Sequence, residues 1–191
     1  MRCRWLFLRS RQAGKSILLL GMVAAVTWLW HAVTTGDALT VTLLATMPPP
    51  ATAVLVALAL HSPFGELERT ASAPLPALRL LHVSGLLLVA TVALILATRS
   101  GASDGWTLAR NVAGLAGLAL LAASVAGSVI AWAVPLAYGA LVVLAGASVP
   151  WAWPLWPIDD RSALTVAIAL LLLGLIASGR NGLHEEAGET G

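Results

Sequence analysis

The chain has 191 residues, of which 59% are hydrophobic and only 10% are charged, and its mean hydropathy is +0.88. A soluble globular domain carries about 25% charged residues, because charged side chains have to cover its surface. So few charges exclude an ordinary soluble domain. The composition predicts an all-α integral membrane protein in contact with the lipid bilayer, since hydrocarbon accepts apolar surface and requires backbone hydrogen bonds to be made within each segment.

The net charge of +2 conceals a cluster of basic residues at the N-terminus. Residues 1–15 contain five of the eleven basic residues, directly before the first apolar run. Such a cluster holds its end of a span in the cytoplasm, so we expect a basic cytoplasmic N-terminus. We expect no binding to nucleic acid, because these residues adjoin a span and form no separate basic domain.

The first apolar run covers residues 16–33. A cleaved signal peptide is the alternative interpretation, since a basic start and an apolar middle also fit one. No clean Ala-x-Ala cleavage site follows the run, and its length suffices for a span. The sequence therefore favours a retained transmembrane helix.

The second run, residues 38–60, is interrupted by Pro48-Pro49-Pro50. Successive prolines remove backbone donors and clash with the preceding turn. We expect the second span to be broken at Pro48–Pro50, with a regular helix resuming from about Pro50. A discontinuous helix on a substrate pathway and a helix that starts late, after an interfacial entry segment, both fit this pattern.

Four further apolar runs follow, at residues 78–97, 108–130, 131–149 and 162–177. The fourth and fifth have almost no polar linker, which predicts a tight turn near residues 128–134 and leaves open two full spans or a re-entrant pair. The runs together predict one polytopic helix bundle of about six spans over residues 16–177. Residues 178–191 are polar, Gly-rich and acidic, and predict a disordered cytoplasmic tail.

The basic residues also predict the orientation of the bundle. If the N-terminus is cytoplasmic, eight basic residues fall in or beside the cytoplasmic segments and three fall outside. This distribution follows the positive-inside rule. We therefore expect a multi-pass protein of the cell membrane with both termini in the cytoplasm.

Small residues recur four apart on the fourth run, at Ala113 and Gly117 and at Ala123 and Gly127. Such spacing allows the backbone of another helix to approach closely, either within the chain or between two copies.

Trp151, Trp153 and Trp156 alternate with prolines between the fifth and sixth runs. Indoles favour the headgroup region, so these three are predicted interfacial anchors; an aromatic lid over a substrate is the functional alternative.

Motifs for catalysis and for cofactors are missing from the sequence. Gly14-Lys15-Ser16 imitates the end of a phosphate-binding loop, but Arg9 stands where that loop needs its first glycine. There is no metalloprotease His–Glu pair, no Gly-x-Ser-x-Gly elbow and no charged residue near the middle of a span. We expect no enzymatic activity, cofactor or metal for this chain, and no ion-coupled transport.

The loop between the second and third runs has the clearest functional pattern. Leu67, Ala71 and Leu75 recur every four residues, and the polar residues Glu66, Glu68, Arg69 and Ser72 lie on other faces. This pattern predicts a short amphipathic helix over residues 65–72 on the cytoplasmic interface, stopped by Pro74. A surface helix of this kind could receive force from a soluble partner, and a connector helix without a partner fits the pattern equally well.

The motif Gly65-x-Leu67-Glu68, followed by Ser72-x-Pro74-Leu75 and an apolar span, resembles the corresponding loop of type-2 ABC exporter permeases. In that family the loop forms a coupling helix that docks on an ATP-binding subunit. The predicted topology is also similar to that of the family. It has six spans, cytoplasmic termini and an outer connection that dips toward the membrane between the last two spans. The chain is shorter than most such permeases. By position, the resemblance implies that the ATPase is contacted by Gly65, Glu66, Leu67, Glu68 and Arg69.

Two functional hypotheses follow. The first is a membrane-spanning, permease-like subunit of an ABC-type exporter, in which two copies form the pathway and a separate ATP-binding cassette subunit supplies the energy. The second is a non-transporting membrane protein, such as an accessory or immunity protein that packs against another complex. The small-residue face and the short loops suggest the second.

Overall fold

The computed structural model describes residues 13–33, 43, 46–58, 75–98, 105–157 and 159–181, and within them it contains helices and no strand. The predicted amphipathic helix at residues 65–72, most of the basic N-terminus and most of the acidic tail lie outside these residues. The helices are α2 (Ala13–Val33), α4 (Pro48–Leu58), α6 (Leu75–Ala97), α7 (Gly105–Ala126), α8 (Ser128–Ala131), α9 (Ala133–Ala145), the 3₁₀ helix η1 (Trp153–Leu155) and α10 (Arg161–Asn181).

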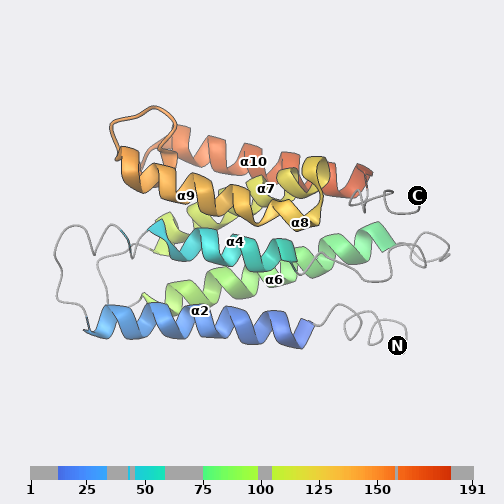
Figure 1. Ribbon diagram of the computed structural model, residues 1–191, viewed down its shortest axis with the longest axis horizontal. Coiled ribbons are helices and arrows are strands. Elements are labelled where there is room, and N and C mark those ends of the chain that lie inside the picture. Colours follow the sequence, from blue (N-terminus) through green and yellow to red (C-terminus); the bar gives the residue numbers. More distant parts are fainter. Residues whose placement is uncertain are drawn as a thin grey trace.

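The long helices lie side by side in a bundle, with their axes roughly parallel (Figure 1). Successive helices alternate in direction along the bundle. The start of α2 and the end of α10 therefore lie at the same end of the bundle, and so do the end of α4 and the start of α6 (Figure 1). The α7 start, the α9 end and η1 lie at the other end.

Helix α7 is the central element of the upper half of the bundle. It packs most extensively against α10 and also contacts α4, α6 and α9. In the part of α7 that is long and apolar enough to cross a membrane, 67% of the residues are buried inside the bundle. In the corresponding part of α10, 17% of the residues are buried. Helix α7 therefore belongs to the interior, whereas α10 covers one side of it and turns most of its surface outward.

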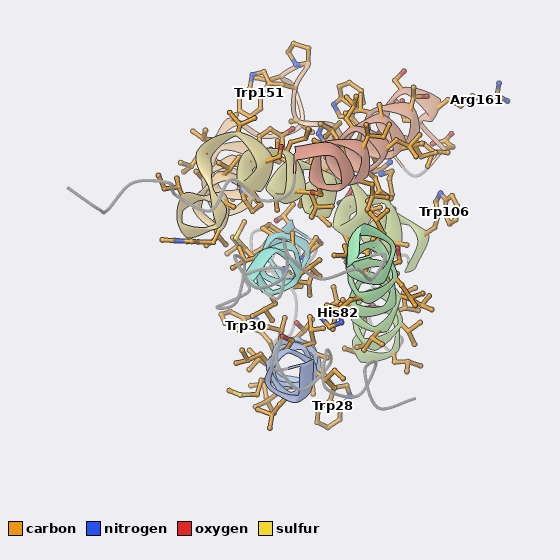
Figure 2. All side chains as sticks on the ribbon, turned by 90° about the vertical axis from the view of Figure 1, so that its right-hand side faces the viewer. Trp28, Trp30, His82, Trp106, Trp151 and Arg161 are labelled. Atoms are coloured by element: carbon orange, nitrogen blue, oxygen red, sulfur yellow. The ribbon has the colours of Figure 1, made fainter. Side chains whose placement is uncertain are left out.

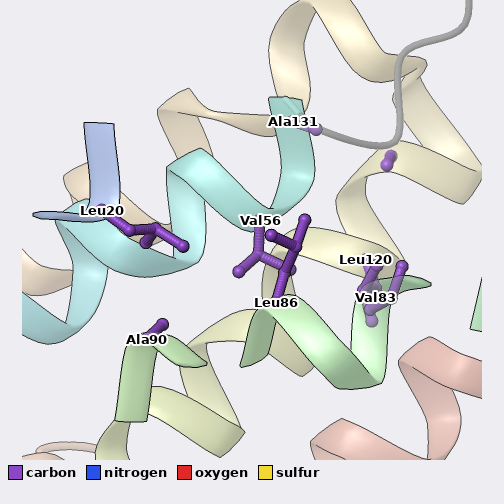
Figure 3. Close-up of a cluster of buried hydrophobic side chains, with 8 residues drawn as sticks. Leu20, Val56, Val83, Leu86, Ala90, Leu120 and Ala131 are labelled. Carbon is purple, nitrogen blue, oxygen red and sulfur yellow. The ribbon is translucent and has the colours of Figure 1, made fainter. Parts of the chain in front are cut away.

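The lower half is joined to α7 through a cluster of aliphatic side chains from several helices (Figure 3). Each central member of the cluster is at most 4% exposed. Its members are Leu20 on α2, Val56 on α4, Val83, Leu86 and Ala90 on α6, Leu120 and Ala123 on α7, and Ala131 on α8. Full burial of one of its valine or leucine side chains contributes about 1.5–3 kcal/mol when the alternative is water.

The outward faces of the helices are apolar too. Large hydrophobic side chains more than half exposed include Leu18 and Leu29 on α2, Leu88 and Leu96 on α6, and Leu172 and Ile176 on α10. The indoles of Trp28, Trp106 and Trp151 also point away from the bundle (Figure 2). A soluble monomer rarely exposes apolar surface continuously on several sides.

Three helices of the described chain are long and apolar enough to cross a membrane, over Leu80–Ala97, Gly105–Ala126 and Arg161–Gly179. Two shorter apolar stretches, Ser16–Trp30 in α2 and Ala133–Ala145 in α9, accompany them. Together with the apolar outer surface, these helices indicate a membrane-associated helical protein.

Three threonine hydroxyls on the helices form hydrogen bonds within their own helix. Thr27 donates to the carbonyl of Val23 at 2.7 Å, Thr91 to that of Leu87 at 2.8 Å and Thr98 to that of Leu94 at 2.9 Å. A hydroxyl in hydrocarbon finds no water, so bonding to the carbonyl four residues earlier removes the cost of leaving it unpaired. This arrangement agrees with membrane-embedded helices.

The proline triplet begins a helix and does not lie inside one. Helix α4 starts at Pro48, two residues earlier than predicted, after a bend at Met47, and all three prolines are buried. The first N–H groups of a helix have no acceptor within it, and prolines have no N–H to satisfy. The next donor, Ala51 N–H, reaches the Met47 carbonyl at 3.3 Å. The triplet therefore lets α4 begin inside the bundle without exposing several donors to an apolar environment.

The boundary between the fourth and fifth predicted spans lies earlier than expected. Helix α7 ends at Ala126, not near residue 130, because Gly127 has φ 84° and ψ 161°, a conformation that side-chain-bearing residues rarely adopt. The short helix α8 and a turn at Trp132 then lead into α9. Helix α9 ends at Ala145, before Gly146 at φ 73°, so the predicted run to residue 149 is four residues too long.

Candidate functional site

Two neighbouring polar residues on α7 are buried at the end of the bundle where α9 leads into α10. Arg110 is 3% exposed and Asn111 is 1% exposed. Both face the proline- and tryptophan-rich segment 150–157. The sequence pattern placed Arg110 at the outer entrance to the fourth span and assigned no role to Asn111.

The Arg110 guanidinium is surrounded by backbone carbonyls of this segment. Its Nη1 donates to the Pro157 carbonyl at 2.9 Å, and its Nη2 donates to the Trp156 carbonyl at 3.0 Å. The Nη2 group also lies 3.4 Å from the carbonyls of Trp153 and Pro154. We call Arg110, Asn111 and these carbonyls of residues 153–157 the Arg110 clamp.

Asn111 completes the clamp. Its Oδ1 accepts from Arg110 Nε at 3.3 Å, and its Nδ2 donates to the Pro154 carbonyl at 2.9 Å. The amide therefore orients the guanidinium and fastens the same segment through a second donor. Neither residue is adjacent in sequence to its main partners, which lie more than 40 residues later.

The clamp compensates for the irregular backbone of the segment. A single 3₁₀ turn between prolines leaves carbonyls that regular structure does not satisfy, and each unsatisfied buried group costs about 1–3 kcal/mol. A guanidinium presents five N–H donors in a planar fork, whereas an ammonium group is a compact donor with a different geometry. Arginine therefore suits a position ringed by several carbonyls.

Trp153 carries the segment into the bundle. Its indole is 4% exposed and joins a buried cluster with Ala53, Leu115 and Ala167. A Cβ atom at Gly114 of α7 would overlap this indole, so glycine is needed for the close approach. The Tyr138 ring of α9 stacks against Trp153, with centroids 6.4 Å apart. The Tyr138 hydroxyl donates to the Trp151 carbonyl.

The three predicted interfacial tryptophans therefore differ from one another in the structure. Trp151 is 42% exposed and points outward (Figure 2). Trp156 is half-buried against the cluster around Trp153. Trp153 lies inside the bundle, so its indole packs against protein; the position of the three tryptophans relative to the headgroups remains a prediction. The Pro-rich backbone bends back, and Gly114 leaves room for the ring.

A glycine contact joins α7 to α10 next to the clamp. A Cβ atom at Gly117 would overlap the backbone of Leu170 and Leu171, and one at Gly174 would overlap the Gly117 carbonyl. Of the other predicted packing positions, Ala123 is buried in the cluster of Figure 3, Ala113 is half-buried and Gly127 ends α7. The period-four pattern did not include Gly114 or Gly174; a glycine inside an apolar helix is the signal that could have marked them.

The start of α10 is capped by Asp160. Its Oδ1 accepts from the N–H groups of Ser162 at 2.7 Å and Ala163 at 3.1 Å. This is the N-cap arrangement that satisfies two donors of the first helical turn. The cap fixes where α10 begins, four residues after Pro157, whose carbonyl accepts from Arg110.

Substituting Asp160→Ala is expected to destabilise the protein by about 1 kcal/mol, because the cap is lost. Asp160→Asn retains a side-chain oxygen and should lose much less. Thermal unfolding in mild detergent, followed by tryptophan fluorescence, measures both. Equal losses for the two variants would show that the negative charge, not the cap, stabilises this end of α10.

The arrangement positions a segment of backbone. Arg110 and Asn111 direct their hydrogen-bond donors mainly at backbone carbonyls of residues 153–157. Across the residues that the structure describes, no three His, Cys, Asp or Glu side chains gather where a metal ion could bind. The predicted ATPase contact, Gly65 to Arg69, lies outside those residues.

Comparisons of this chain with known protein families, with curated proteins and with solved structures find no match.

Proposed function

We propose that this chain is a membrane-spanning, permease-like subunit of an ABC-type exporter, energised by a separate ATP-binding subunit. It crosses the cell membrane about six times, with both termini in the cytoplasm, and two copies form the pathway. The observation that carries the proposal is the resemblance of Gly65-Glu66-Leu67-Glu68 and Ser72-Ala73-Pro74-Leu75 to the coupling loop of type-2 exporter permeases.

The direction of the helices supports this topology. The ends of α4 and α6 that flank residues 59–74 lie at the same end of the bundle as the start of α2 and the end of α10 (Figure 1). The basic cluster of residues 1–15 leads into α2 at that end, so the positive-inside rule makes it cytoplasmic. The coupling-like loop would then face a cytoplasmic ATPase.

Six crossings require the shorter helices to contribute. Helix α4 has eleven residues and rises about 16 Å, roughly half of the hydrocarbon thickness of a bilayer. It completes a crossing only together with the residues before Pro48, as a discontinuous span. Helices α8 and α9 form the fifth crossing in sequence, bent at Trp132.

The Arg110 clamp gives further support at the opposite end. The connection between α9 and α10 turns back into the bundle, and Trp153 reaches Gly114, nine residues into α7. Type-2 exporter permeases resemble this chain in having an outer connection that dips toward the membrane at this place. The clamp would keep the outer end of the pathway closed and rigid while the loop near Glu66 receives force.

Affinity purification of the tagged chain after mild detergent extraction tests the proposal. We expect an ATP-binding cassette protein to accompany it, and reversing the loop charges (Glu66→Lys, Glu68→Lys, Arg69→Glu) to abolish the association. A matched control reverses two exposed charges near the start of α10, Asp159→Lys and Arg161→Glu, and should leave it intact. The proposal fails if no ATPase accompanies the chain, or if the loop variant binds it as well as the control does.

The alternative is a non-transporting accessory or immunity protein. The short connections between α7, α8 and α9 favour it, because they leave little surface outside the membrane for substrate handling. Purified chain and partner ATPase, reconstituted together in vesicles, distinguish the two. ATP-driven flux of any solute excludes the accessory role.

A further inference from the structure

A cavity of about 450 Å³ opens between α2 and α4 on the outer side of the bundle. This volume lies in the range of small-molecule sites. Four of its lining residues on α2 are also exposed: Leu19, Met22, Val26 and Trp30 are 42–57% accessible. The cavity is therefore a groove continuous with the outward-facing apolar surface. Its walls are formed by Leu19, Met22, Val23, Val26, Thr27 and Trp30 on α2 and by Leu43, Met47, Pro48, Ala51 and Leu55 at and before α4.

The groove offers an apolar surface. Besides Thr27 and the indole of Trp30, its lining side chains are aliphatic or thioether groups. The Thr27 hydroxyl donates to the Val23 carbonyl, Pro48 has no N–H, and the Ala51 N–H bonds to the Met47 carbonyl. A polar or charged solute would lose its hydration here and gain little in return.

The groove extends along α2. From Leu19 to Trp30 the groove follows α2 for about 17 Å, which is close to half of the hydrocarbon thickness of a bilayer. A single flexible hydrocarbon chain has the right length and a small enough section.

One end of the groove is marked by an amphipathic side chain. Trp30 lies three residues before the end of α2 and sits on the side of α2 that faces α4, whereas Trp28 points away (Figure 2). Indoles near helix ends favour the boundary between hydrocarbon and headgroups. The Trp30 end is thus where the polar part of a lipid would remain. Met22 and Met47, which are unbranched, can adjust to an irregular chain.

We infer that the groove between α2 and α4 binds one acyl chain of a bilayer phospholipid from the leaflet at the Trp30 end. This inference requires membrane embedding and not an exporter activity, so it stands or falls separately from the ATPase association proposed above. A bound chain would fill the space between α2, which is a peripheral helix, and the broken start of α4.

Photo-crosslinking of the full chain tests the inference. The protein is reconstituted in phosphatidylcholine vesicles that contain a small fraction of phosphatidylcholine with a diazirine midway along one acyl chain, and labelled residues are mapped by mass spectrometry. We expect labelling of residues 19–30 and 47–55 to exceed that of the exposed face of α10 by about fivefold, the enrichment that corresponds to roughly 1 kcal/mol of preference. Equal labelling of the groove and of α10 overturns the inference, because all exposed faces would then be contacted at random.

Variants that fill the groove provide the second arm. Ala51→Phe places a ring in the groove and should reduce its labelling to the level of α10, and Ala25→Phe on the outward face of α2 should not. Met22→Trp fills the groove from a residue that is 56% exposed, so its effect does not depend on repacking α4. Undiminished groove labelling in folded Met22→Trp protein overturns the inference.

Discussion

Replacing Gly117 by alanine is expected to destabilise the folded chain by about 1–3 kcal/mol, the usual cost of overpacking a filled interior. The added methyl group would overlap the backbone of Leu170 and Leu171, and backbone cannot move aside as a flexible side chain can. Helices α7 and α10 would have to separate along their whole contact. Thermal unfolding in mild detergent, followed by tryptophan fluorescence, gives the size of the effect.

Gly85→Ala on α6 is the matched control for Gly117→Ala. A Cβ atom at Gly85 would meet no other atom within 4 Å, and alanine has a higher helix propensity than glycine. We therefore expect Gly85→Ala to be neutral or stabilising. If both substitutions shift the melting temperature by the same amount, α7 and α10 do not approach each other as closely as the glycine contact requires.

Removing the Arg110 side chain is the second change with a large expected effect. Arg110→Ala removes the donor to the Trp156 carbonyl and the second donor to the carbonyls of Trp153, Pro154 and Pro157, and we expect a loss of about 1–3 kcal/mol. Arg110→Lys keeps a positive charge but not the planar fork of donors, so it should recover only part of this stability. Near-UV circular dichroism should report the altered environment of Trp153, and thermal unfolding the lost free energy.

Arg161→Ala supplies the control for the Arg110 variants, because Arg161 is exposed and points away from the bundle (Figure 2). It removes the same side chain from the same end of the molecule and should change stability by less than about 0.5 kcal/mol. The clamp is refuted if Arg110→Lys is as stable as the unaltered chain. In that case the charge alone would suffice and the carbonyl contacts would contribute nothing measurable.

Several features of the fold were predictable because they depend on local chemistry. The apolar runs predicted the helices α6, α7 and α10, with every end displaced by no more than four residues, since a helix in hydrocarbon is specified by the length and composition of its own segment. The proline triplet predicted the start of α4 to within two residues. Proline has no backbone N–H and its ring clashes with the preceding turn, so it interrupts a helix that precedes it in the chain. The count of about six crossings and the orientation remain predictions.

The candidate site was less predictable because its parts are distant in sequence. Arg110 is the third residue of an apolar run, and its pattern fits a surface residue at a span entrance. Its burial depends on carbonyls more than 40 residues later that folding brings to it. The burial of Trp153 also depends on a residue distant in sequence. Its ring fits inside the bundle because Gly114, a glycine of another helix, leaves room for it.

The composition and the apolar runs alone predicted that this chain associates with a membrane and that its segments are helical. Both properties follow from the transfer of single segments out of water. Only the tertiary structure decided which small residues allow close approach and which end a helix. Gly117 and Gly127 are equivalent in a period-four pattern, yet one lies against the α10 backbone and the other has a positive φ. A helix face has no packing role until a second helix is placed on it, and that placement depends on all the contacts of the bundle at once.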